Sequence, residues 1–137
     1  MSTTVIAQSD LTCAGARAQP PGNVNCTANE FAVVATLQNA AGSPPTCIAG
    51  ETVFVNVGLS LSGSNADRRD IAFFVGQNGN SPRLNGGQCS VATFPNSPSP
   101  YLQIDGDSCG DFLNGGVANP VIQNVKLNCA AAANGEL

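Results

Sequence analysis

Apolar and polar residues alternate along several short segments of the chain. The clearest segment is 52–61, whose apolar side chains fall on one face: Val53, Val55, Val57, Leu59 and Leu61. Strict alternation of this kind predicts a half-buried antiparallel strand. Residues 31–37 alternate in the same way, with Phe31, Val33, Ala35 and Leu37 on a common face.

Other segments predict further strands. Residues 70–75 are more continuously apolar and predict a central strand. Three more strands are expected at 89–94, 101–104 and 121–129. Turns rich in Gly and Pro separate these segments, as in AAGSPP and LNGGVANP. The pattern predicts an all-β fold, specifically an Ig-like antiparallel β-sandwich of about seven strands that is stapled by disulfides.

The first residues fit this plan less well. Residues 1–23 contain two brief β-like pieces, at 3–6 and 11–14, followed by a Gln-Pro-Pro-Gly break. We therefore divide the chain into an N-terminal extension at 1–23, which is a candidate donor or edge strand, and a β-sandwich domain at 24–137. The large apolar residues of the extension are the candidate assembly residues: Val5, Ile6 and Leu11.

Composition excludes several classes of function. The net charge is −4, and a nucleic-acid partner requires a basic face. No apolar run approaches the roughly 20 residues of a membrane span. The absence of histidine excludes a Ser/His/Asp or Cys/His catalytic arrangement. The acidic residues are not placed as an acid and a base across a cleft, so we expect no enzyme activity.

Six cysteines are spread over the whole chain: Cys13, Cys26, Cys47, Cys89, Cys109 and Cys129. They form no CxxC pair, which disfavours a zinc site and favours three disulfides in an oxidising compartment. The N-terminus has no signal-peptide character, so we expect a mature chain or one whose leader has been removed. From the strand positions we expect the pairs Cys89–Cys109, Cys47–Cys129 and Cys13–Cys26.

The segment 105–111, DGDSCGD, is the densest acidic stretch of the chain. Asp105, Asp107 and Asp111 match the first, third and seventh positions of an EF-hand loop, and Gly110 matches the sharp turn at the sixth. Cys109 occupies the fifth position, and a glycine stands where the bidentate Glu belongs. We favour a turn whose carboxylates accept backbone hydrogen bonds and which a disulfide of Cys109 anchors. The alternative is a calcium site.

A second charged cluster precedes the strand predicted at 70–75. Arg68 and Arg69 come directly before Asp70. A buried carboxylate at the start of an apolar strand needs a partner, so we expect a salt bridge to Arg69 or donors from a neighbouring strand.

Several motifs, in order, resemble a family of secreted bacterial β-rich domains of large extracellular and surface proteins. They are NCTANEF, TCIAGETV, RRDIAFFV followed by GQNG, GGQCS, DGDSCGD and VKLNC, which together cover most of residues 25–129. The resemblance implies a structural or adhesive role and no established catalytic residues. Many members continue past the last matching cysteine to a further cysteine, where this chain reads AAAANGEL. Cys13 is the candidate replacement partner.

These observations together predict a non-catalytic structural subunit of a bacterial extracellular fibre, sheath or surface adhesin. Subunits would self-associate by head-to-tail donation of the N-terminal strand, because an open sheet edge accepts a strand from a neighbour. The alternative is a monomeric, calcium-dependent carbohydrate-binding or adhesion module. Tyr101 and a few Phe residues are the aromatic side chains that a sugar would need.

Overall fold

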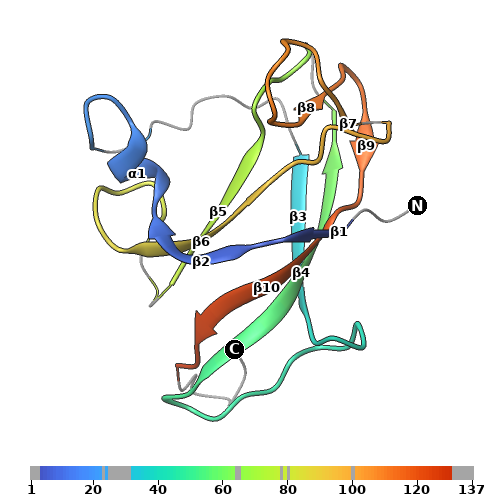
Figure 1. Cartoon of the computed structure of the whole chain (residues 1–137). Helices are drawn as coiled ribbons and strands as arrows, with labels where there is room; N and C mark the ends of the chain where they lie inside the picture. The colour runs from blue at the N-terminus through green and yellow to red at the C-terminus, as the bar shows by residue number, and fades with distance from the viewer. Residues whose placement is uncertain are drawn as a thin grey trace.

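The computed structural model describes residues 4–22, 24, 32–63, 66–77, 79, 81–99 and 101–130. Strands dominate this part of the chain (Figure 1). Its elements, in chain order, are β1 (Thr4–Ile6), β2 (Gln8–Thr12), α1 (Ala14–Arg17), β3 (Ala32–Gln38), β4 (Thr52–Ser62), β5 (Ala72–Gly76), β6 (Gln88–Thr93), β7 (Tyr101–Leu102), β8 (Asp111–Phe112), β9 (Val117–Ala118) and β10 (Val121–Asn128). The predicted all-β fold is confirmed, and its Ig-like form stays a prediction.

The larger sheet has the strand order β1-β10-β4-β3, with β9 paired to one end of β4. β1 runs parallel to β10, whereas the other neighbours are antiparallel. The alternating pattern of β4 acts as predicted, because Val55, Val57, Leu59 and Leu61 are buried while the residues between them face outward. β4 is the longest of the described strands, and its inward side chains form the central part of the core.

The smaller sheet has the order β2-β6-β5, so β5 is an edge strand and its predicted central position is wrong. The error has a physical cause, since both faces of β5 are covered even though one edge is not. Phe73 packs against Phe94 with ring centroids 5.0 Å apart, on the core side. Phe74 packs on the opposite side, under the guanidinium of Arg17 at 5.4 Å. The continuous hydrophobicity of this segment therefore indicates that both faces of β5 are packed, and it does not indicate that β5 has a neighbouring strand on each edge.

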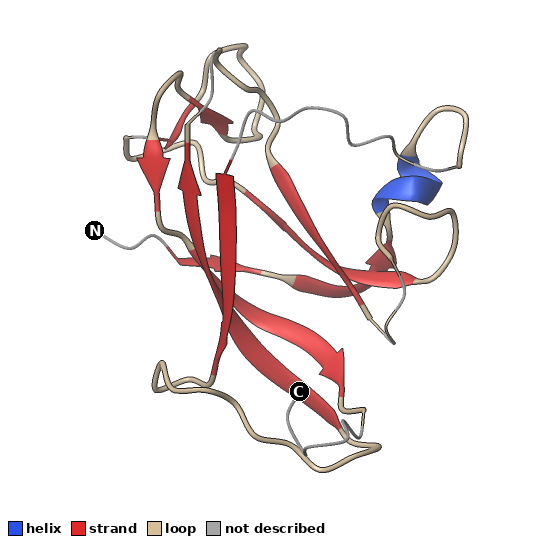
Figure 2. Ribbon diagram, turned by 180° about the vertical axis from the view of Figure 1, so that it is seen from behind, coloured by secondary structure: helices blue, strands red, loops and turns tan. Residues whose placement is uncertain are grey.

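The core lies between the two sheets and extends to a third pair of strands, β7 and β8. Phe94, at the end of β6, contacts both Tyr101 of β7 and Phe112 of β8, with ring centroids 4.7 and 5.8 Å apart. The short strands β7, β8 and β9 gather at one end of the molecule, where Figure 1 labels them and Figure 2 shows the same end from behind. The strand predicted at 101–104 ends early, at Leu102.

The N-terminal segment belongs to both sheets. β1 forms one edge of the larger sheet, and after Ala7 the chain continues as β2, the edge of the smaller sheet (Figure 1). Ala7 is only 2% exposed, and its backbone N–H donates to the carbonyl of Gln123 at 2.8 Å. One continuous segment thus closes one side of the space between the sheets.

Two disulfides are present in the described residues. Cys47 bonds Cys129, as predicted. Cys13 bonds Cys89, so the expected pairs Cys89–Cys109 and Cys13–Cys26 are wrong. The reason is the antiparallel pairing of β2 with β6, which places the end of β2 beside Cys89. Cys109 is a free thiol in this structure, and Cys26 lies outside the described residues.

No helix in the described ranges is long and apolar enough to cross a membrane.

Candidate functional site

The acidic stretch at 105–111 lies between β7 and β8, at the end of the molecule where the short strands gather. Asp111, in β8, is completely buried. One of its carboxylate oxygens accepts the backbone N–H of Asp70 at 2.9 Å, and the other accepts that of Ile104 at 2.6 Å. A buried carboxylate needs such donors, and these two hold three chain segments together. Asp111 is therefore primarily a structural residue.

The side chain of Gln103 stabilises the acidic turn by hydrogen bonds to several of its residues. Its Oε1 accepts the backbone N–H groups of Asp105 and Gly106 at 3.1 and 2.9 Å. Its Nε2 donates to the carboxylate of Asp107 at 3.0 Å and also to the carbonyl of that residue. The same carboxylate accepts the N–H of Cys109 at 2.8 Å. Gly106 has φ of 91°, a left-handed conformation that favours glycine.

Gly110 allows this turn to approach the smaller sheet. Its N–H donates to the carbonyl of Phe94 at 3.1 Å, and its carbonyl accepts from the N–H of Ile71 at 3.1 Å. A Cβ at this position would lie 2.1 Å from the carbonyl oxygen of Pro95, so only glycine fits. The acidic turn is therefore fixed to the ends of β5 and β6 through the backbone.

Asp70 is an unexpected member of the acidic group. It precedes β5 with φ of 55°, a conformation that Asp and Asn tolerate better than most residues. A hydrogen bond to the Asp107 side chain, followed by partial desolvation and the negative charges of Asp107, Asp105 and Asp111, raises the pKa of Asp70. The described residues contain no ion pair between Asp70 and Arg69, so the expected salt bridge is wrong.

The cluster offers two overlapping sets of ligand atoms. In one set the side-chain atoms of Asp70, Asp105 and Asp111 lie within 4.8 Å of one another, and in the other those of Asp70, Asp107 and Cys109 do. Burial, followed by the charges of Asp107 and Asp70, raises the pKa of the Cys109 thiol, which disfavours the thiolate that a soft metal needs. Oxygen-rich ligands of this kind suit a hard cation such as calcium, which takes six to eight oxygens.

The predicted site residues are thus partly brought together. The turn whose carboxylates accept backbone hydrogen bonds is observed for Asp107 and Asp111, whereas its anchoring disulfide at Cys109 is not. Both oxygens of Asp111 are already used, so its EF-hand role as a calcium ligand is weakened. Asp70 could not be found from local spacing, because it joins the turn only through the fold.

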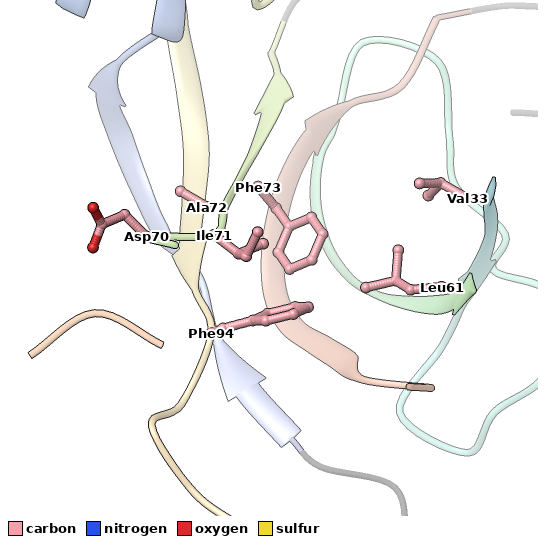
Figure 3. Close-up of a pocket in the computed structure, with 7 residues that line it drawn as sticks. All are labelled: Val33, Leu61, Asp70, Ile71, Ala72, Phe73 and Phe94. Carbon is pink, nitrogen blue, oxygen red and sulfur yellow. The ribbon is translucent and has the colours of Figure 1, made fainter. Parts of the chain in front are cut away.

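A groove of about 380 Å³ lies next to the acidic cluster and has Asp70 among its lining residues. It is lined mostly by apolar residues of the two sheets: Val33, Leu61, Ile71, Ala72, Phe73 and Phe94. Figure 3 shows Val33 and Leu61 opposite Phe73, with the carboxylate of Asp70 directed away from them. The groove therefore has an apolar interior with a single charged residue at its end.

The candidate assembly residues differ in their surroundings. Val5 packs against the main core, and Leu11 packs beside the Cys13–Cys89 disulfide. Ile6 lies between them in sequence but is 70% exposed. Tyr101, the candidate sugar-stacking residue, is 2% exposed and therefore cannot offer its ring to a carbohydrate.

The described part of the chain is an all-β domain with two disulfides and an acidic turn. Comparisons with protein-family models, with curated proteins and with solved structures find no match to this chain. The resemblance to secreted bacterial surface domains consequently stays a prediction from the motifs.

Proposed function

We propose that the chain is a non-catalytic structural subunit of a bacterial extracellular fibre, sheath or surface adhesin, in which copies exchange their N-terminal strands head to tail. The observation that carries this proposal is the position of residues 4–12. They form an edge of both sheets, so they can leave without breaking a strand pair between other elements. The vacated edge then accepts the same segment from a neighbour.

The Cys13–Cys89 disulfide supports such an exchange. It fixes the chain covalently at Cys13, directly after β2, so residues before Cys13 can move while the rest of the domain keeps its covalent staples. Disulfides also suit a subunit exposed outside the cell, where an oxidising environment preserves them. Because each copy both gives and receives a strand, the contact is heterologous and builds an open filament.

Two substitutions in the N-terminal segment test the proposal as a matched pair. Ala7 is buried, so Ala7→Arg prevents the segment from entering any acceptor edge, its own or a neighbour's. Ile6 is 70% exposed, so Ile6→Arg adds the same charge next to it with little effect on docking. We expect filaments in negative-stain electron micrographs of the wild type and of Ile6→Arg, and none for Ala7→Arg.

Circular dichroism separates assembly from folding in the same three proteins. The proposal is wrong if Ala7→Arg still forms filaments, or if the wild type gives only isolated particles at every concentration. In the second case the segment acts only within its own domain, and Ala7→Arg lowers the melting temperature of a monomer.

The convergence of Asp70 with the acidic turn favours a second candidate, a calcium-dependent adhesion module. A cation bound only by the native state raises the melting temperature by mass action. Millimolar calcium should therefore stabilise the wild type, and Asp107→Ala should remove this effect. Asp67→Asn is the matched control, because Asp67 is an exposed acid that caps the N–H of Asn114 outside the cluster. A melting temperature that does not respond to calcium leaves only the structural turn.

A further inference from the structure

The two sides of the space between the sheets are not equivalent. One side is closed by the continuous β1–β2 segment. On the other side β3 and β5 are both edge strands, and the 380 Å³ groove opens between them. In the described residues no strand pairs with the outer edge of β3 or of β5. We call this side, between β3 and β5, the open seam.

β3 lacks the features that usually protect an edge strand from pairing with another chain. Its sequence, AVVATLQ, contains no charge and no proline. All seven residues pair with β4 in one continuous register without a bulge. Val33 and Val34 point to opposite faces of the sheet, yet they are 55% and 64% exposed. A long, regular and apolar edge of this kind is a template for a further strand.

The pairing of β3 with β4 shows which backbone N–H and C=O groups of β3 are available for pairing with another strand. Leu59 of β4 donates its N–H to Pro120 on the far side of the strand, at 2.9 Å. Ala35 stands opposite Leu59, so in an antiparallel ladder its own N–H and C=O must point away from β4. By alternation the same holds for Val33 and Leu37. Three evenly spaced residues therefore present their backbone groups to the open seam.

We propose that β3 of one chain pairs antiparallel with β3 of a second copy, about a two-fold axis through Ala35. This register places Ala35 opposite its counterpart, and Val33 opposite the partner copy's residue 37. Each of the three resulting pairs exchanges two backbone hydrogen bonds, giving about six in all. No other register centred within β3 pairs all three outward-facing residues.

The same register matches the side chains on both faces. On the inner face, the leucine at 37 of each copy lies beside Val33 of the other, at the mouth of the groove that Val33 lines. On the outer face, Val34 stands opposite a threonine, a favourable pair of β-branched residues. The strand has no charge, so pairing two copies of an acidic chain along it brings no like charges directly together. The occupant that the observations favour is therefore a second copy.

This contact is separate from the exchange of N-terminal strands, because it uses the opposite side of the molecule. Deleting residues 4–12 removes the proposed filament contact and leaves β3 in place. Ala7→Arg should likewise leave the β3 contact intact. A protein that forms filaments but no β3 dimer contradicts only the β3 proposal, and one that dimerises but forms no filaments contradicts only the strand-exchange proposal.

Paired charges at positions 34 and 36 provide the test, since these exposed positions face one another across the proposed axis. Val34→Lys/Thr36→Lys places like charges opposite each other twice, whereas Val34→Glu/Thr36→Lys places opposite charges there. All variants are made in the Ala7→Arg background, which blocks the filament contact. Sedimentation equilibrium at low salt should then show a dimer for Ala7→Arg alone and for the Glu/Lys variant. The Lys/Lys variant should dimerise at least about tenfold more weakly than the Glu/Lys variant.

Ala35→Pro supplies an independent variant. It removes an outward N–H at the centre of the contact without removing a bond to β4, and proline is tolerated at such edge positions. We expect it to abolish the dimer while circular dichroism stays that of the wild type. Equal dimerisation of the Lys/Lys and Glu/Lys variants overturns the proposal. So does an Ala7→Arg protein that stays monomeric up to about millimolar concentration.

Discussion

Replacing Asp111 by alanine should destabilise the domain more than the same substitution at either of the other two aspartates of the acidic turn. Asp111 is fully buried, and its two oxygens accept the N–H groups of Asp70 and Ile104 at 2.9 and 2.6 Å. The substitution removes both acceptors and leaves two backbone donors without partners. Hydrogen bonds to a charged group contribute roughly 1.5–3 kcal/mol each.

Both donors are only partly buried, so water can replace part of what is lost. We therefore use the lower end of that range, which gives about 3 kcal/mol for Asp111→Ala. In a domain of this size each kcal/mol lowers the melting temperature by roughly 3–5 °C, so the expected decrease is about 10 °C. Asp111→Asn keeps one acceptor and should cost about 2 kcal/mol.

Asp105→Ala is the matched control. Asp105 is an exposed member of the same cluster, and its hydrogen bond to Gln103 comes from the backbone, which the substitution keeps. The change should alter the free energy of unfolding by less than about 0.5 kcal/mol. Thermal and urea unfolding followed by circular dichroism measure all three variants. A loss below about 1 kcal/mol for Asp111→Ala, or equal losses for Asp105→Ala and Asp111→Ala, refutes the structural role of Asp111.

Two further predictions concern the same region. Because the pKa of Asp70 is raised, the folded protein keeps a proton on this carboxyl to higher pH than the unfolded chain does. The stability that protonated Asp70 contributes is therefore present at low pH and is lost as the pH rises above the ordinary pKa of 3.8. Asp70→Asn, which suits the left-handed backbone at this position, should raise the melting temperature at pH 7 and change it much less at pH 3; an equal effect at both values contradicts this. Non-reducing peptide mapping should recover Cys13–Cys89 and Cys47–Cys129 as linked peptides. Cys109 is a free thiol in the structure, so a thiol reagent should label it, and recovery of Cys109 in a disulfide-linked peptide contradicts this prediction.

Local patterns in the sequence were enough to find the main strands. The alternation at 52–61 predicts β4 correctly, because the outward and inward positions of a strand follow directly from its pleat. Cys47–Cys129 is also predicted correctly, although it depends on a contact between distant strands, because the prediction ties an early strand to the last one and β4 and β10 are neighbours in the sheet. Only the alternation at 52–61 is information contained in the residues themselves.

Features that depend on which strands become neighbours could not be predicted in the same way. Cys13 bonds Cys89 because β2 pairs with β6, a contact between segments far apart in the chain. Asp70 reaches the acidic turn because Ile71 and Gly110 share a backbone hydrogen bond. The acidic pattern at 105–111 likewise gave no sign that Asp111 turns inward while Asp105 stays exposed. Spacing along the chain identifies candidate ligands but not their burial.

The acidic turn and the open seam share one short segment of the chain. Asp70 contributes its carboxylate to the acidic cluster and lies at the end of the groove, and Ile71 lines the groove while its N–H is bound to Gly110 of the turn. Phe94, the next groove residue, donates its N–H to Ile71 and accepts from Gly110. Any ligand or substitution that moves the turn must therefore move one wall of the groove. Since β3 forms the opposite wall, the acidic turn can influence the shape of the groove without altering the strand that we propose pairs two copies.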